Sequence, residues 1–355
     1  MDASRKSLQT NSLDFSRLLL YLKNKNGPGK LILGSTLFFQ YDLITKDKIM
    51  EMKKIITLLI LMPLLFSAQA QSIQSFSGSL LWKISGNGLS SPSYILGTHH
   101  LTPGSFADSI PGLDTALKET RLTAGELILS DMSSLQENMI NESKMPKNES
   151  YEQLLSPEDY GKLNECLKNS FGAGLEGFSQ FKPAMISVMY SFMLYTRVHP
   201  EIVRPEHEGL DSYLQRIGLE NNIPVIGLET AEDQLNTLFN SLSLKKQAED
   251  LMCTISLPVE LALEGLNLLN KYYREGNLTE MYQLSFHSPD DPCPPSPESI
   301  DNMLKNRNDK WLEKLPGIML ENPSLIVVGA LHLAGEEGLL YQLNQRGYKV
   351  EAVKE

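Results

Sequence analysis

Hydrophobic residues after residue 75 follow two different patterns along the chain. Short apolar runs bounded by Gly, Pro, Asn or Ser are typical of β-strands. The expected strands cover residues 80–84, 93–96, 125–129, 222–229, 324–328 and 348–353. Asn87-Gly88 separates the first two runs, and this dipeptide favours a tight turn, so we predict that they pair as an antiparallel hairpin.

Between these runs, apolar residues recur at the 3.6-residue spacing of a helix. Helices are expected at residues 110–120, 231–275, 304–320 and 337–346. The helical pattern is also strong from about 150 to 215, where a stripe of methionine and other apolar residues is expected to face a core. That stripe consists of Met185, Val188, Met189, Phe192 and Met193.

Strands that alternate with helices at both ends of the region predict an α/β fold. We expect a mainly parallel central sheet with flanking helices. A helical insertion, at about 150–215, is expected between the N- and C-terminal strand units.

Residues 50–70 have the pattern of a secretory signal peptide. A short basic start leads into an apolar stretch that contains Pro63 and ends at Ala68-Gln69-Ala70. The stretch is shorter than the about 20 residues that span a bilayer. We therefore predict cleavage after Ala70 and export to the periplasm or the extracellular space. A buried core helix is the alternative interpretation.

A signal peptide at this position divides the chain. Residues 1–49 would be an upstream extension without a structural role, the true start being Met50 or Met52, unless they form an unusually long start of the signal itself. The mature domain would cover residues 71–355. No cysteine lies near Ala70 to carry a lipid, so no stable membrane anchor is expected after cleavage.

Acidic residues outnumber basic ones, 43 to 32, which gives a formal net charge of -11. Nucleic-acid binding needs a dense basic surface to neutralise phosphate, so nucleic acid is excluded as an expected partner. The charge does not bear on a catalytic site.

The three cysteines suggest one disulfide in an oxidising compartment. Cys293 lies in a proline-rich loop and Cys166 lies in a helical pattern, so we predict a Cys253–Cys293 bond and a packed free thiol at Cys166. No Cys-x-x-Cys pair is present, which argues against a structural zinc site.

Two segments repeat the same arrangement, an apolar strand followed by Gly-x-x-His. The first ends in Gly97 and His100, and the second in Gly329 and His332. Ligands bind beyond the carboxyl ends of the strands in an open α/β sheet, and histidine is both a common metal ligand and an acid or base near neutral pH. One such histidine is usually structural, but two matching units favour a shared site. By alternation His99 should point away from His100 and support the site indirectly.

Acidic residues fall at the ends of two internal strands, Glu126 and Glu229. Two histidines and one or two glutamates would suit a divalent cation that activates water. They would equally suit a metal-free acid–base pair. Glu229 could instead cap the helix that starts near Ala231.

Six motifs in a fixed order resemble the TraB/GumN family, which includes the Tiki proteases, and more distantly the erythromycin-esterase and ChaN-like proteins. They are Tyr94 to His100, Glu126, Gly209-Leu210-Asp211, Gly227 to Gln234, Arg307-Asn308 and Val328 to Leu333. The resemblance runs from near Leu81 to Val353. His99 stands where the family usually has an apolar residue.

The resemblance implies a metal-dependent protease that uses manganese or cobalt. Its metal ligands would be His100, Glu126 and His332. Glu126, Arg307 and Asn308 would be catalytic, Arg307 stabilising an oxyanion and Asn308 orienting a ligand or water. Supporting or structural positions would be Gly97, His99, Asp211, Glu229 and Gly329.

The expected function is thus an exported metal-dependent hydrolase, most simply a peptidase, acting on a peptide or a small amide or ester. Two alternatives stay open. One is a protein that binds a peptide signal without cleaving it, as some family members inhibit pheromones. The other is a metal-free His/Glu hydrolase that resembles an esterase.

Overall fold

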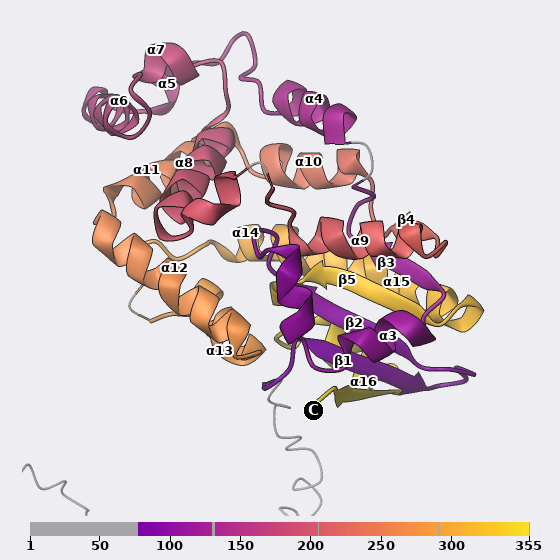
Figure 1. The fold of residues 1–355 in the computed structure, drawn as a ribbon. Helices are drawn as coiled ribbons and strands as arrows, with labels where there is room; N and C mark the ends of the chain where they lie inside the picture. Colours follow the sequence, from indigo (N-terminus) through magenta and orange to yellow (C-terminus); the bar gives the residue numbers. More distant parts are fainter. Residues whose placement is uncertain (1–76, 130–131, 205, 290, 355) are drawn as a thin grey trace, which may run out of the picture. The chain divides into compact units, whose positions relative to one another are not determined.

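A mixed six-stranded sheet organises the described part of the chain (Figure 1). The computed structural model describes residues 77–354 except 130, 131, 205 and 290, all within the unit Ile73–Glu355. The expected signal peptide and upstream extension lie outside the described residues. The strands are β1 (Leu81–Gly86), β2 (Ser93–Thr98), β3 (Leu122–Gly125), β4 (Val225–Gly227), β5 (Ser324–Gly329) and β6 (Tyr348–Ala352).

The strand order is β4-β3-β5-β2-β1-β6. The first four strands in this order run parallel, whereas β1 is antiparallel to both of its neighbours, β2 and β6. The predicted α/β fold with a mainly parallel sheet is therefore confirmed. The predicted hairpin of β1 and β2 is also present, and Asn87 and Gly88 take the positive φ angles of 46° and 84° that its turn needs.

The third strand differs from its prediction. The apolar run at 125–129 was expected to be a strand, but β3 covers Leu122–Gly125. Beyond it, the Glu126 carbonyl still accepts from the Glu229 N–H, but the backbone of Leu127 and Leu129 bonds to a side chain. Gln215 accepts from the N–H of Leu129 and donates to the C=O of Leu127. Glu126 consequently lies just after the strand. The strand expected at 222–229 is likewise shorter, since β4 spans only Val225–Gly227.

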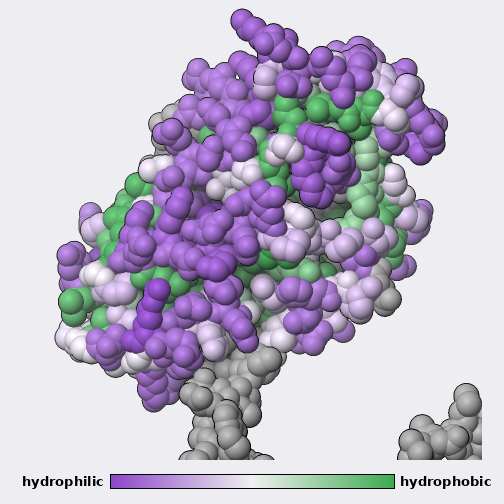
Figure 2. Space-filling model, turned by 180° about the vertical axis from the view of Figure 1, so that it is seen from behind, coloured by the Kyte–Doolittle hydropathy of each residue, from purple (hydrophilic) through white to green (hydrophobic). Residues whose placement is uncertain are grey.

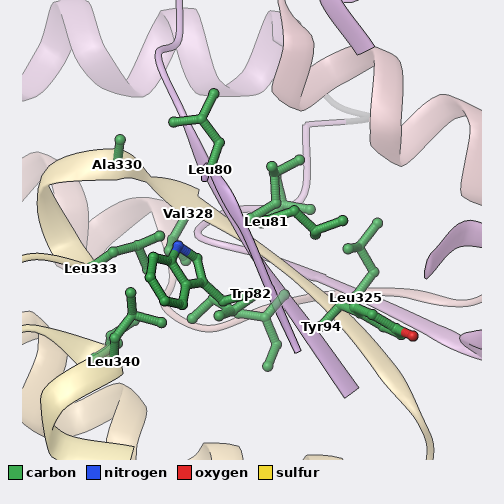
Figure 3. Close-up of a cluster of buried hydrophobic side chains, with 14 of the residues drawn as sticks. Leu80, Leu81, Trp82, Tyr94, Leu325, Val328, Ala330, Leu333 and Leu340 are labelled. Atoms are coloured by element: carbon green, nitrogen blue, oxygen red, sulfur yellow. The ribbon is translucent and has the colours of Figure 1, made fainter. Parts of the chain in front are cut away.

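Several helices and helical turns lie near the sheet and the two candidate histidines, His100 and His332. They are η1 (Gly104–Ser109), α3 (Leu113–Glu119), α9 (Leu210–Glu220), α13 (Leu278–Phe286), α14 (Pro297–Ile300), a π-helix η3 (Asp301–Lys305), α15 (Asn306–Glu321), η4 (Ala330–His332) and α16 (Leu339–Gln345). Apolar residues of these elements other than α14 and η3 join those of the strands in the largest core. Figure 3 shows part of it, where Trp82 of β1 lies close to Val328 of β5 and to Leu333 and Leu340.

A second layer consists of helices alone. Its members are α4 (Met132–Glu142), α5 (Tyr151–Leu154), α6 (Pro157–Phe171), α7 (Leu175–Phe178), α8 (Pro183–Val198), η2 (Pro200–Val203), α10 (Ala231–Asn240), α11 (Leu244–Ser256) and α12 (Val259–Arg274). This layer contains helices from before, within and after the region of about 150–215. Helices α10, α11 and α12 pack on α4, α6 and α8, whereas α9 returns to β3 and β4.

The stripe predicted along α8 is correct only in part. Met185 is buried, but Val188 and Phe192 are each 43% exposed. The helix buries a neighbouring face instead, which carries Ile186, Tyr190 and Leu194.

Hydrophilic residues dominate the face of the molecule in Figure 2, and hydrophobic residues interrupt them in patches. Within the described residues, no single helix is long and apolar enough to cross a membrane. Helices α11 and α12 meet that test only as a pair, and the chain bends by 97° between them.

One disulfide joins Cys253 in α11 to Cys293 in the loop before α14, as predicted. Cys166 is a free, partly buried thiol. The bond ties the helical layer to the segment that leads into η3 and α15.

We expect the double substitution Cys253→Ser/Cys293→Ser to lower the free energy of unfolding by about 4 kcal/mol, because it frees a loop with a sequence separation of 40 in the unfolded chain. Chemical denaturation of both proteins measures this difference. Cys166→Ser is the control and should unfold like the parent. An unchanged midpoint in the double variant would contradict the expectation.

Candidate functional site

Four polar residues gather where four adjacent parallel strands end. Glu229 follows β4, Glu126 follows β3, His332 follows β5 and His100 follows β2. The strands are in register, since Gly125 pairs with both Gly227 and Val327 and Thr98 pairs with Gly329. Parallel strands place their carboxyl ends at one edge of the sheet, so these side chains lie along that edge in strand order.

The two strand-end glycines allow close approach. A Cβ on Gly97 would lie 2.9 Å from Cδ1 of Leu333 and 3.0 Å from Cα of Ala330, so only glycine lets β2 pack against the turn after β5. A Cβ on Gly329 would enter a space between three side chains. It would lie 3.2 Å from Oε1 of Glu126, 3.6 Å from Cδ2 of His332 and 3.7 Å from Nε2 of His100.

Arg307, in the first turn of α15, is the cation at the centre of this group and is 7% exposed. Its Nε and NH2 groups bind both oxygens of Glu229 at 3.1 and 2.6 Å. NH2 also donates to Glu126 at 2.5 Å. NH1 donates to the Met303 carbonyl and to Nε2 of His332, at 3.2 and 2.9 Å. All five N–H groups therefore have protein acceptors, and an oxyanion could reach one only by replacing a partner.

Glu126 is buried but strongly stabilised as a carboxylate. Its Oε1 accepts the Gly329 N–H at 2.7 Å, and its Oε2 accepts from Arg307 and, at 3.3 Å, from Gln234. Burial by itself raises the pKa of the Glu126 carboxyl, but the positive charge of Arg307 and the hydrogen bond from the Gly329 N–H hold it below its usual range.

His332 is held as a neutral imidazole. Since Arg307 can only donate, Nε2 of His332 must accept, and the proton is on Nδ1, which bonds Oδ1 of Asn308 at 2.7 Å. Burial away from water lowers the pKa of His332 to about 3, in agreement with this assignment. Asn308 also donates to the carbonyls of His332 and Glu337. Its amide is thereby used to position His332, and it does not line the cavity described below.

His100 is the most accessible of these groups, with 64% of its side-chain surface exposed. Its Nδ1 lies 3.2 Å from Oδ2 of Asp211, and Thr98 donates to Oδ1 of the same carboxylate at 2.7 Å. The surrounding protein disfavours the charged ring, but the hydrogen bond and charge of Asp211 more than offset this and raise the pKa of His100 to about 9. With Nδ1 turned to Asp211, Nε2 is left toward the space beside Gly329.

One sequence alternative is resolved by these contacts. Glu229 does not cap α10, because Thr230 is the N-cap residue and forms a capping box with Asp233. Glu229 instead binds Arg307, and both side chains are buried. The ring of His99 stacks on Tyr195 at a centroid distance of 5.3 Å, and His99 also lines the cavity described below.

A cavity of about 470 Å³ opens beside the site. Its polar lining includes His100, Arg307 and His332, together with Thr98, His99 and Ser285. Leu101 and apolar residues of α12, α13, η3 and η4 form its walls. A second cavity of about 200 Å³ is lined by His100, Glu126, Asp211 and Gln234 among others. These wall residues show only ordinary helical periodicity in the sequence, and sequence reasoning therefore misses them.

The donor types fit a divalent metal ion, because two imidazoles and one carboxylate suit manganese, cobalt and similar cations. Gly329 leaves open space between those donors. The described residues, however, contain no group of three or more His, Cys, Asp or Glu side chains already arranged to hold a metal ion. Arg307 is the reason, since it takes Nε2 of His332 and one oxygen of Glu126. Coordination by His332 requires Arg307 to release it.

The fold and site are those of an α/β protein whose polar centre lies at the carboxyl ends of parallel strands. Residues 80–352 match the TraB/PrgY/gumN family, and the chain belongs to this family. No curated protein and no solved structure matches the chain.

We expect Asp211→Asn to lower the pKa of His100 from about 9, because an amide does not favour the imidazolium as a carboxylate does. NMR titration of the His100 ring in protein kept free of metal measures this. Glu201→Gln is the matched control, since Glu201 contacts a different histidine, His199, at 3.1 Å. A His100 midpoint that stays near 9 in Asp211→Asn would show that the Asp211 contact does not control the proton.

Proposed function

We propose that this protein is a hydrolase of the TraB/GumN type that cleaves an amide or ester bond, most simply in a peptide. The observation that carries the proposal is the accessible His100, oriented through Nδ1 by Asp211, beside a buried cluster of Glu126, Arg307 and His332 and next to a cavity. A histidine oriented by a carboxylate is the arrangement used for general acid–base catalysis of acyl transfer.

In this proposal each residue has a separate task. His100 holds or moves a proton at Nε2, while Asp211 fixes the ring and balances its charge. Glu126 and Arg307 supply fixed charges close to the reacting group. Asn308 keeps His332 in one tautomer and one orientation. Such preorganised charges stabilise a transition state without reorganisation at the moment of reaction.

The proposal includes a divalent metal, manganese or cobalt by family resemblance, which would be held by His100, Glu126 and His332. Because Nδ1 of His100 faces Asp211, Nε2 would then bind the metal in place of a proton. A bound metal would lower the pKa of a water molecule and supply a nucleophile. Because His332 is engaged by Arg307, metal binding would exchange one cation for another at its Nε2.

Export to the periplasm or the extracellular space, after cleavage behind Ala70, also belongs to the proposal. The Cys253–Cys293 disulfide supports it, because such bonds persist in oxidising compartments.

A peptide-binding protein without catalysis is the second candidate. The complete pairing of Arg307 favours it, since no N–H of that residue is free to meet a substrate oxygen. Mass spectrometry of a peptide recovered after long incubation separates the candidates. Any cleavage product rules out pure binding. The metal-free His/Glu hydrolase differs only in keeping its activity when chelators are present.

We expect His100→Ala and His332→Ala each to lower hydrolysis by at least about 10²-fold, the usual range for losing an acid–base group. His100→Ala should keep the stability of the parent because the ring is exposed, whereas His332→Ala should lose about 1–3 kcal/mol by leaving buried partners unpaired. Peptide-library hydrolysis and thermal unfolding measure the two effects. His287→Ala, at an exposed histidine outside the cavity lining, is the control. Full turnover in either site variant would place the chemistry elsewhere.

We expect the protein purified without chelators to contain about one equivalent of divalent metal, and the double variant His100→Ala/His332→Ala to contain none, because two of the three ligands are lost. Elemental analysis after equilibration with manganese or cobalt measures the content. Equal metal in both proteins would exclude these histidines as ligands. No metal in either would favour the metal-free alternatives.

A further inference from the structure

The larger cavity is polar at one end and apolar elsewhere. His100, Arg307 and His332 lie at the polar end. The apolar walls come from α12, α13, η3, the turn after β5 and the segment after β2. They comprise Leu101, Leu269, Met281, Phe286, Met303, Leu304, Ala330 and Leu331.

The apolar walls of this cavity disfavour a charged occupant. Arg307 is the one permanently charged side chain among the described lining residues, and its five N–H groups are all bonded to protein acceptors. His100, whose pKa Asp211 raises to about 9, is a second cation in the lining. A carboxylate or ammonium group placed between the apolar walls and away from His100 would lose its hydration without a partner. An apolar group would instead gain from leaving water.

The smaller cavity shares one residue with the larger one, His100. It is more polar, since Glu126, Asp211 and Gln234 line it. A substrate that reaches both cavities must pass His100. His100 then lies beside the bound substrate, with the apolar cavity on one side of it and the more polar cavity on the other.

We propose that the larger cavity is the specificity pocket of this site and accepts a large apolar side chain, such as that of Phe, Leu or Met, next to the bond that His100 acts on. Cleavage of a bond beside the pocket rests on the proposed function, whereas the preference of the pocket for an apolar group follows from its lining residues alone. Its volume of about 470 Å³ lies within the range of pockets that bury small ligands. The substrates are accordingly peptides with a large apolar residue, and peptides with Asp or Ser at that place are poor substrates.

Ser285 provides a way to close the pocket without removing core packing. It lines the cavity from α13, so Ser285→Trp should fill the space that the apolar side chain needs. Gln283, on the same helix, is exposed and outside the lining, which makes Gln283→Trp the matched control. Met303→Gln keeps nearly the same size and adds a polar amide to the wall, so it tests the pocket should the tryptophan variant not fold.

The test uses the full chain and the labelled peptides fluorescein-Ala-Ala-Xaa-Ala-Ala-amide, with Xaa as Phe, Leu, Ser or Asp. Binding is measured by fluorescence anisotropy with the His100→Ala variant, in which turnover is suppressed. We expect the Phe and Leu peptides to bind at least about tenfold more tightly than the Ser and Asp peptides. Ser285→Trp in that background should abolish the difference, Met303→Gln should reduce it, and Gln283→Trp should preserve it.

An affinity that does not depend on Xaa, including no measurable binding of any peptide, overturns the pocket. So does a preference that survives in a folded Ser285→Trp variant. Hydrolysis of the same peptides by the parent protein is scored separately by mass spectrometry. If apolar peptides bind more tightly but none is cleaved, the proposed hydrolase function is wrong and the specificity pocket stands. If peptides are cleaved but their affinity does not depend on Xaa, the specificity pocket is wrong and the hydrolase function stands.

Discussion

The buried cluster around Arg307 is the interaction on which the arrangement of the site depends. One guanidinium joins segments that follow β3, β4 and β5, because it binds Glu126, Glu229 and His332 at once. Burying charges is costly unless every hydrogen-bonding group is satisfied, and here the five donors are. Removal of a charged partner from such a cluster typically costs about 3–5 kcal/mol, since it leaves an uncompensated charge in the interior. The ends of three strands are thereby held at a fixed spacing, and His100 on β2 completes the edge.

Much of this site could be predicted because parallel strands end at a common edge. The two Gly-x-x-His units, Glu126 and Glu229 are separated by long stretches of sequence, yet each follows a strand in the same sheet. The spacing of apolar residues and the turn-forming residues between them identify such strands without knowledge of which strands pair. The predicted pairing of Cys253 with Cys293 was also confirmed, because one cysteine lay in a loop and the other in a helix within reach of it.

The parts that sequence patterns did not reveal depend on tertiary contacts. Gln215 bonds the backbone of Leu127 and Leu129, so an apolar run that looked like a strand is a loop. The stripe on α8 was displaced because the second helical layer includes α10–α12, and those helices cover a different face from the one that the methionines suggested. The saturation of Arg307 could not be read from an Arg-Asn pair, because it needs acceptors from four other segments. The cavity walls were hidden for the same reason.

The position of the disulfide makes one wall of the cavity sensitive to redox conditions. Cys293 lies shortly before the π-helix that carries Met303 and Leu304, and both of these residues form part of the cavity wall. With reduced cysteines, this wall is connected to the helical layer only by noncovalent contacts. Oxidation adds a covalent link to α11. A reducing agent therefore acts directly on the anchorage of the cavity wall and not on the ion pairs of the strand-end cluster.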